Sequence, residues 1–411
     1  MIHVTEYNSR NSNITLEPAR MKKESIFIGA LLVASVGCSQ PPSAQDSPTP
    51  AATAAATATA TPAAAVPPAE FSDEVKKQAE ELVASREKGH FPYKQLSVKE
   101  NGPAFVYLAT TSDDPEIVSE ALRGMEKTYT ANKAYKKTNK ADETVDAAIL
   151  KALNSDNKSI LYYGLEASGD ALGDEPNQQV LAKLLEIATS HPELGARVEA
   201  VDAMIGVKDP AHNPEVFKAF VKALQDDAPV ASMALFRSGY AFVRADTDGE
   251  MKKVIDGLIK HEDPGVRGRA VEAFRNFHDG ENDLLIETLT PLLKDKNSFV
   301  RSVAVGELAR VKDPRAIDLI VTLLDDKEKN TYDIKYTNLL GKPDSIHHDG
   351  SAWSRVDDAT LRALDSASNS QPKDEQFEYD KIDYKKVDED IAAQVKKAKD
   401  WYAKYKASKK S

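Results

Sequence analysis

The sequence contains a single cysteine, Cys38, in 411 residues. One thiol cannot form a disulfide within the chain, and no second cysteine is available for a thiolate metal site. Basic side chains are outnumbered as well, with 54 Lys plus Arg against 65 Asp plus Glu and a net charge of −11. A chain without a basic excess has little means of displacing counterions from phosphates, so we expect no nucleic-acid partner.

The motifs of common catalytic centres are also absent. The sequence has no H-E-x-x-H, no G-x-S-x-G and no phosphate loop of the G-x-x-x-x-G-K type. His347 and His348 precede Asp349, but adjacent histidines point apart and no further ligand is suggested nearby. We therefore predict a solvated loop at this point, and no catalytic residue, metal or cofactor in the chain.

The N-terminal residues have the features of a targeting segment. Met21-Lys22-Lys23 is followed by an apolar run over residues 26–36, and Gly37 and Cys38 come directly after it. A basic start, a short apolar segment and a small residue describe a secretory signal. The run is too short to span a bilayer, which needs about 20 apolar residues. We predict a signal peptide at 21–37, and we expect residues 1–20 to come from a misassigned start codon.

A cysteine directly after such a segment resembles the bacterial lipoprotein signal, in which the cysteine receives the lipid and becomes the new N-terminus. The departure is Ser35, where that family usually carries Leu. The resemblance implies lipidation of Cys38. Ser39, in place of Asp, implies an outer-membrane location facing the periplasm if the cell has two membranes. The alternative is an ordinary cleaved signal that releases a secreted protein with a free Cys38.

Residues 38–69 have the composition of a tether. They are dominated by Ala, Thr and Pro, Asp46 is their only charged residue, and 51–60 contain only Ala and Thr. Such a segment cannot bury enough apolar side chain to offset the entropy of ordering. We predict a disordered link between a membrane anchor and a folded domain.

From Phe71 onward the apolar residues follow helical spacing. Phe71, Val75, Ala79 and Leu82 form the first stripe, over residues 71–86, which we expect to be an N-terminal cap. No alternating strand pattern of useful length is apparent. The sequence therefore predicts an all-α fold over residues 70–365.

A unit recurs along this region, with one copy at 263–274 and another at 297–308. The aligned valines fall about 32–36 residues apart, at Val198, Val230, Val266 and Val300. Asp263 or Asn297 can cap the helix that follows, and Pro264 suits the first turn because it lacks an N–H. Val266 and Val300 are expected in the core.

These units resemble HEAT repeats, and the opening from Asp263 to Arg267 is the most specific part. The resemblance covers about residues 100–370. It implies a right-handed α-solenoid of about seven short helix pairs, with a concave face made by the second helix of each pair. With the Asp-Pro helix taken as the first of its pair, second helices are expected at 216–224, 251–259, 284–293 and 317–324.

Arginines recur near one position of the unit, at Arg197, Arg267, Arg269 and Arg301. They could form an anion-binding ladder along the concave face. The favoured interpretation pairs them with acidic residues of the neighbouring repeat, as HEAT stacks commonly do.

The repeat pattern breaks at residues 325–350, which we interpret as a polar insertion. Insertions in repeat arrays often lie on the working face, and aromatic residues are enriched in binding hot spots. The candidate partner contacts are therefore Tyr332, Tyr336, His347 and His348. Trp353 is expected in the core, within the last helix of the repeats.

A polar, partly acidic linker is expected at 366–386, before a C-terminal helix at 387–411. That helix either caps the solenoid or docks elsewhere.

Taken together, these features favour a membrane-tethered, non-catalytic scaffold of the bacterial cell envelope with an unidentified protein partner. One alternative is an enzyme or enzyme accessory, because some HEAT-like proteins act as lyases on bilin chromophores. The other is a purely structural envelope protein.

Overall fold

The computed structural model describes residues 70–130, 143–171, 177–204, 207, 213–348, 355–380, 382–383 and 386–409. The chain divides into two units, residues 1–64 and 65–411, and all of the described residues belong to the second. The predicted signal peptide, Cys38 and the whole of the predicted tether lie outside the described residues. Asp349 and Trp353 lie outside them too.

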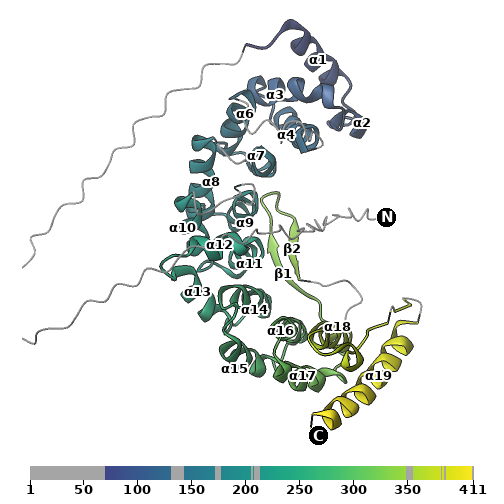
Figure 1. Ribbon diagram of the computed structural model, residues 1–411. Helices are drawn as coiled ribbons and strands as arrows, with labels where there is room; N and C mark the ends of the chain where they lie inside the picture. The colour runs from purple at the N-terminus through teal and green to yellow at the C-terminus, as the bar shows by residue number, and fades with distance from the viewer. Residues whose placement is uncertain are drawn as a thin grey trace, which may run out of the picture. The chain divides into compact units, whose positions relative to one another are not determined.

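The described helices form two rows, and each helix of the first row packs on the helix that follows it in the second. The first row contains α3 (Gly102–Thr111), α6 (Glu143–Leu153), α8 (Gln178–Ser190), α10 (Pro214–Ala223), α13 (Glu250–Leu258), α15 (Asn282–Leu292) and α17 (Pro314–Ile320). The second row contains α4 (Pro115–Thr130), α7 (Lys158–Ala171), α9 (Leu194–Ala203), α11 (Ala228–Arg237), α14 (Pro264–Phe277), α16 (Ser298–Arg310) and α18 (Val356–Ser368). The second-row helices also pack consecutively from α4 to α18. This arrangement is an α-solenoid of seven helix pairs (Figure 1), which confirms the predicted fold class.

The remaining elements are short or terminal. They are α1 (Asp73–Ala84), α2 (Tyr93–Leu96), α12 (Tyr240–Ala245), α19 (Val387–Ser408) and the 3-10 turns η1 (Lys99–Asn101), η3 (Val321–Leu323) and η4 (Lys373–Glu375). α1 packs on α3, as expected of an N-terminal cap.

The predicted pairing of the helices is wrong, because each pair begins one helix earlier in the chain than expected. α14, which opens with the Asp-Pro motif, packs extensively on α13 before it, and α16 likewise packs on α15. The motif therefore begins the second helix of each pair. The helices expected as second ones, at 216–224, 251–259, 284–293 and 317–324, correspond to α10, α13, α15 and α17 of the first row. The spacing of a repeat gives its length but does not show where the unit begins.

Local chemistry explains where the motif helices start. The Asp263 carboxylate accepts hydrogen bonds from the backbone N–H groups of Gly265 and Val266, at 2.8 and 3.1 Å. Asn297 accepts from the Phe299 N–H at 2.9 Å. These bonds satisfy donors that have no partner within the helix. The first turns of these helices bury apolar side chains. Val266 and Val300 are both 0% exposed.

The insertion contains strands, so the expectation of no strand is wrong at this point. β1 (Tyr332–Thr337) pairs with β2 (Pro343–His348) as an antiparallel hairpin. His347 and His348 therefore belong to a strand rather than to the expected loop. The alternation of Tyr332, Ile334 and Tyr336 with polar residues extends over only six positions, which is why it is easily taken for a loop.

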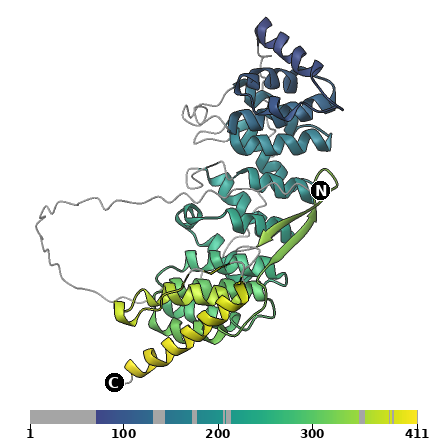
Figure 2. The same cartoon turned by 90° about the vertical axis from the view of Figure 1, so that its right-hand side faces the viewer.

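The C-terminal helix covers the end of the solenoid. α19 packs on α18, and Figure 2 shows it lying across the helices at that end. The Tyr402 hydroxyl donates to Asp318 of α17 at 3.0 Å, and the Lys406 ammonium donates to the same carboxylate at 2.9 Å. Within the segment expected to be a linker, Phe377 is 1% exposed and its ring lies 5.7 Å from that of Trp401. That segment is therefore partly packed into the C-terminal end.

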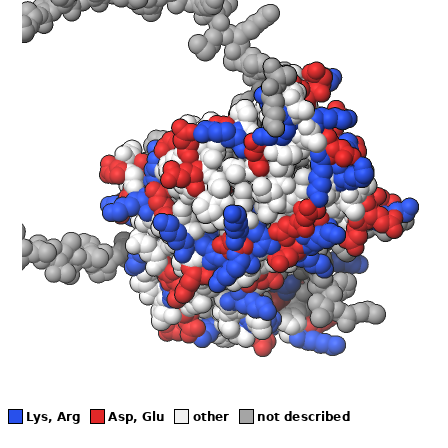
Figure 3. Space-filling model, turned by 90° about the horizontal axis from the view of Figure 1, so that it is seen from below, with Lys and Arg blue, Asp and Glu red and all other residues white. Residues whose placement is uncertain are grey.

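Charge is mixed on the C-terminal end of the molecule. Figure 3 views the end at which α17 and α19 lie in Figure 1, and basic side chains are interspersed with acidic ones there. The acidic excess is thus not gathered into one patch on this face.

In the described part of the chain, no helix is both long enough and apolar enough to cross a membrane.

Candidate functional site: a hairpin over the second helical row

The β-hairpin lies along the second row, where β1 contacts α9, α11 and α14 and β2 contacts α11 (Figure 1). Its strands alternate between two faces. Ile334 pairs with Ile346 across the strands, and both are buried against the helices. Asp333, Lys335 and Thr337 alternate with the inward residues and are exposed. The hairpin therefore has an apolar face on the helices and a polar face toward solvent.

Two glycines let the hairpin approach the helices closely. A Cβ added at Gly265, in the first turn of α14, would lie 2.7 Å from the Ile334 side chain. A Cβ at Gly195, in the first turn of α9, would lie 2.9 Å from the backbone nitrogen of Leu339. Both distances are too short for real contacts, so glycine is needed at both helix starts.

A tyrosine ties β1 to the repeat motif. The Tyr332 hydroxyl donates to Asp263 Oδ2 at 3.1 Å, while Oδ1 of the same carboxylate caps α14. Burial, followed by the nearby Asp263 charge, raises the pKa of Tyr332 to about 12. Asp263 therefore serves the helix and the hairpin at once.

The second tyrosine of β1 is bonded to a half-buried acid. The Tyr336 hydroxyl donates to Glu199 of α9 at 3.3 Å. Burial raises the pKa of Glu199 to about 8, and the charges of Asp202 and Glu166 add to the rise, against the opposing effect of the Tyr336 hydrogen bond. Asp202 is itself paired with Arg237 of α11, whose Nε donates at 2.6 Å.

A similar pair lies on α7. The Tyr162 hydroxyl donates to Glu166 at 3.1 Å. Burial raises the pKa of Glu166 to about 7, and the Glu126 charge adds to the rise. Asp344 of β2 lies close enough to raise the pKa of Tyr162 and Glu199 further. Under the hairpin there are thus two carboxyl groups that titrate near neutrality, which we call the Glu166–Glu199 cluster.

Three of the recurring arginines are paired within the solenoid. Arg197 donates from two nitrogens to Asp226, at 2.9 and 3.0 Å, and Arg267 does the same to Asp295, at 2.9 Å for both contacts. Arg301 donates to Asp326 at 2.6 Å. Each partner acid follows in the next repeat, at the start of the neighbouring helix or loop. This pairing, which is bidentate for Arg197 and Arg267 and joins Arg301 to both Asp326 and Glu328, leaves little of these guanidinium groups for an anion ladder.

Arg269 donates to Glu272 of its own helix at 2.8 Å, and it also borders an open groove. This groove has a volume of about 460 Å³ between α14, α16 and α18. A Cβ added at Gly306, which lines it, would meet no atom within 4 Å. The Arg269 guanidinium lies 4.8 Å from the ring of Phe236 of α11, and Arg237 lies 4.7 Å from the same ring. Phe236 is 48% exposed. We call this region the Phe236 groove.

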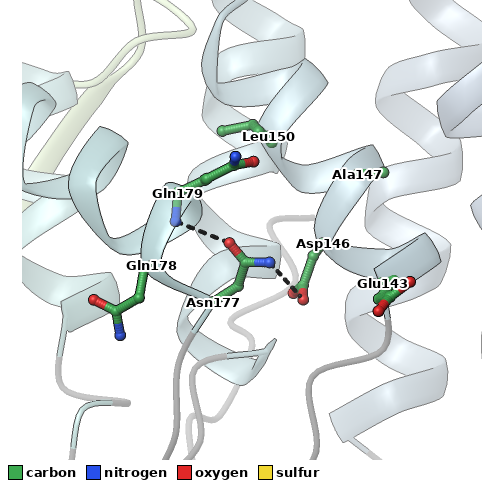
Figure 4. A pocket seen from close by; sticks show the side chains of 7 residues that line it. All are labelled: Glu143, Asp146, Ala147, Leu150, Asn177, Gln178 and Gln179. Carbon is green, nitrogen blue, oxygen red and sulfur yellow. Dashed lines mark hydrogen bonds between the residues drawn. The ribbon is translucent and has the colours of Figure 1, made fainter. Parts of the chain in front are cut away.

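A smaller pocket, of about 370 Å³, lies between α6 and α8 (Figure 4). Its central side chain, Asn177, accepts from the Gln179 N–H at 2.9 Å and donates to Asp146 at 3.2 Å. The first bond caps α8, and the second joins the start of α8 to α6. The polar atoms of Asn177 are therefore satisfied within the chain.

The structure separates the predicted contact residues. Tyr332 and Tyr336 lie on the inward face of β1 with their hydroxyls bonded inside the chain. His347 and His348 are placed in β2 by their backbone pairing alone. The corresponding positions of the repeat in α14 and α16 hold Val266 and Arg267 and, one repeat later, Val300 and Arg301. Cys38 lies outside the described residues. Among the described residues, no group of three His, Cys, Asp or Glu side chains is arranged to hold a metal.

The acids under the hairpin were not identified from the sequence. Glu166 and Glu199 each stand between apolar residues on helices whose neighbouring positions are buried. That placement of an acid within an apolar stripe is the signal that could have found them.

Comparison with known proteins bears on the repeats. Residues 251–332 match the family model for HEAT repeats, a range that spans α13 to α17. HEAT repeats commonly provide extended surfaces for protein–protein interaction. No curated protein matches the chain.

Solved structures give distant likenesses. A crystal structure of an engineered protein is 16% identical with a TM-score of 0.36, over 80% of this chain and 96% of that one. The complex of CpcE and CpcF of phycocyanin lyase from Nostoc sp. PCC7120 is 15% identical with a TM-score of 0.33, over 74% and 93%. Both TM-scores are too low to indicate a shared function.

Proposed function

We propose that the chain is a non-catalytic scaffold that binds another protein along its second helical row. The observation that carries the proposal is Phe236, a half-exposed aromatic side chain with two arginines stacked on it, beside an open groove. Aromatic and Arg side chains dominate binding hot spots. The hairpin covers α9, α11 and the start of α14, whereas the groove between α14, α16 and α18 stays open to a partner.

We also propose that the protein is exported and held at a membrane by a lipid on Cys38. This rests on the sequence alone: a basic start, a short apolar run and the only cysteine directly after it. The Ala/Thr/Pro-rich residues that follow would give the solenoid reach, and the anchor would raise its effective concentration near a membrane partner.

Crosslinking followed by affinity capture from intact cells tests partner binding. The natural chain should enrich a specific protein, and Phe236→Ala and Gly306→Arg should each lose it. The arginine is tolerated structurally because the space at Gly306 is open. Lys253→Ala, an exposed change on α13 of the first row, is the control and should retain the partner. Absence of any enriched protein would favour a purely structural envelope role instead.

Membrane attachment is tested with Cys38→Ser. If the anchor is real, the natural chain incorporates labelled fatty acid and sediments with membranes, whereas the variant does neither. A natural chain that is recovered without lipid in the soluble exported fraction would contradict the anchor and leave ordinary secretion.

The second candidate is an enzyme or enzyme accessory of lyase type, and the Glu166–Glu199 cluster favours it. Carboxyl groups with pKa values near neutrality suit general acid–base catalysis. Glu199→Gln distinguishes the two candidates. A scaffold retains both its partner and the partner's activity in this variant, whereas an accessory acting through the carboxylate retains the partner but loses the activity.

A further inference from the structure

A third cavity lies at the tip of the hairpin, apart from the Phe236 groove. It has a volume of about 440 Å³ and is lined by the turn at residues 88–90, the first turns of α4 and α7, and Leu340 and Lys342 of the hairpin. We call it the tip cavity. Its volume is in the range of pockets that hold small molecules.

Two residues that line the tip cavity have buried polar atoms without a hydrogen-bond partner. Ser119 Oγ and Glu120 Oε2 are buried and have no hydrogen-bond partner among the described residues, and both residues are 6% exposed. The other oxygen of Glu120 is used, since it lies 3.2 Å from His90 Nδ1 and 3.5 Å from an Arg123 nitrogen. A buried polar atom left unbonded costs free energy, so these residues are suited to a ligand that donates hydrogen bonds.

The lining of the cavity also contains two lysines, besides Glu116, which is bonded to Arg86. Lys88 and Lys342 line it and are exposed, and neither ammonium has an ion pair with another described residue. The first turns of α4 and α7 also border the cavity, and helix N-termini carry partial positive charge. These lysines and helix starts are suited to the negative end of a ligand.

The turn that brings Lys88 to the cavity is fixed in place. Lys88 and Gly89 have φ values of +53° and +88°, and Glu87 and His90 bond to each other across the turn. Arg86 donates to the Gly89 carbonyl at 2.9 Å and to Glu116 of α4 at 3.3 Å.

The hairpin tip is fixed as well. The Asn338 side chain accepts from the backbone N–H groups of Leu340 and Lys342, both at 3.1 Å. It donates to Asp344 at 3.1 Å. Leu339, next to it, is buried against Gly195. The turn at residues 88–90 and the hairpin tip are therefore both held in position before any ligand enters.

We propose that the tip cavity binds a small zwitterion, a free amino acid or a short peptide, through its ammonium and carboxylate ends. The ammonium donates to Ser119 Oγ and Glu120 Oε2, and the carboxylate lies between Lys88 and Lys342. Tyr163, which also lines the cavity, provides an aromatic wall for the part between them. This site is independent of the partner surface at the Phe236 groove.

Isothermal titration of the full chain in detergent tests the proposal. The probes are the free amino acids, the dipeptide Ala-Ala, and methylamine and acetate as the two half-ligands. We expect at least one zwitterion to bind more than tenfold more tightly than either half-ligand. Comparison of the free amino acids with Ala-Ala distinguishes the two sources of the same chemistry.

Substitutions then assign the site. Lys342→Ala removes an exposed charge and leaves the fold intact, and Glu120→Gln removes the buried charge at nearly constant size. Each should weaken binding about tenfold or more, because each removes a charge-assisted hydrogen bond. Lys335→Ala, an exposed lysine on the same hairpin that does not line the cavity, should leave the affinity unchanged.

Two results would overturn the proposal. One is the absence of heat for every probe at millimolar concentration, which would mean that water alone satisfies Ser119 and Glu120. The other is binding that is equally strong in Lys342→Ala and in the natural chain, which would place the ligand elsewhere even if Glu120→Gln were unstable.

Discussion

The Tyr336 hydroxyl donates a hydrogen bond to the Glu199 carboxylate at 3.3 Å, although 137 positions separate the two residues in the chain. The bond joins the insertion to α9 and places the hairpin over the Glu166–Glu199 cluster. Because the pKa of Glu199 is raised to about 8, the protonated acid is the form that burial favours.

This shift predicts how stability depends on pH. A carboxyl group whose pKa is higher in the folded state than its usual 4.5 releases more protons on unfolding as pH rises. The free energy of unfolding should therefore fall between about pH 5 and pH 8, and Glu166, with a pKa of about 7, adds to the fall. Glu199→Gln should raise stability at pH 8 by on the order of 1–3 kcal/mol, with little change at pH 5.

Urea unfolding at pH 5, 6.5 and 8 measures this difference. Glu215→Gln, at an exposed position of α10, is the matched control and should follow the natural chain at every pH. A Glu199→Gln profile parallel to that of the natural chain would show that Glu199 does not titrate in this range.

Removing the hydroxyl of Tyr332 should weaken the hairpin without affecting α14. Tyr332→Phe keeps the ring and loses the 3.1 Å bond to Asp263, so we expect a loss of about 0.5–1.5 kcal/mol in urea unfolding. Asp263→Ala should cost more, because it removes the helix cap as well. If the double variant costs the sum of the two single changes, Tyr332 and Asp263 are not coupled and the bond is absent in solution.

Two glycine-to-alanine changes should have opposite signs. Gly265→Ala places a methyl group 2.7 Å from Ile334 and should destabilise by about 1–3 kcal/mol. Gly306→Ala, inside α16, meets nothing within 4 Å and should stabilise by about 0.5–1 kcal/mol. Thermal unfolding measures both, and proteolysis within 332–348 should accelerate only in Gly265→Ala. Equal effects of the two changes would mean that the hairpin is not seated on α14.

The attachment of α19 should depend on one acid of α17. Asp318→Ala removes the acceptor of both Tyr402 and Lys406, so amide exchange across 387–408 should become faster. Asp400→Ala is the control, because Asp400 pairs with Lys396 inside α19. Unchanged exchange in Asp318→Ala would show that apolar packing, such as that of Tyr405 and Ala398, holds the helix without these bonds.

The parts of the fold that could be predicted are those that local chemistry decides. Asp263, Pro264 and Val266 each meet a need of their own helix, so the motif predicted helix starts, burial and a repeated pair. The C-terminal helix was also predicted at 387–411 and begins at Val387. Its stripe of Ile391, Ala398 and Tyr405 is buried as the spacing requires.

The candidate site was not predictable in this way. Tyr332 and Tyr336 stand out in the sequence as aromatic residues in an insertion, but their partners lie 69 and 137 residues away. Whether such a residue faces solvent or the helices depends on those distant contacts. The same holds for Ser119 and Glu120, which look like ordinary residues of an amphipathic helix until the hairpin brings Lys342 to the same cavity.

The hairpin also has a mechanical consequence. In a stack of repeats, each helix pair touches only its neighbours, so bending strain spreads over all of the interfaces. Here β1 contacts α9, α11 and α14 together, which joins two repeats that are not adjacent. Bending between α9 and α11 or between α11 and α14 would separate the hairpin from Gly195 or Gly265. We therefore expect the repeats under the hairpin to bend less than the repeats toward the ends. The Phe236 groove extends to α18, at one of those ends.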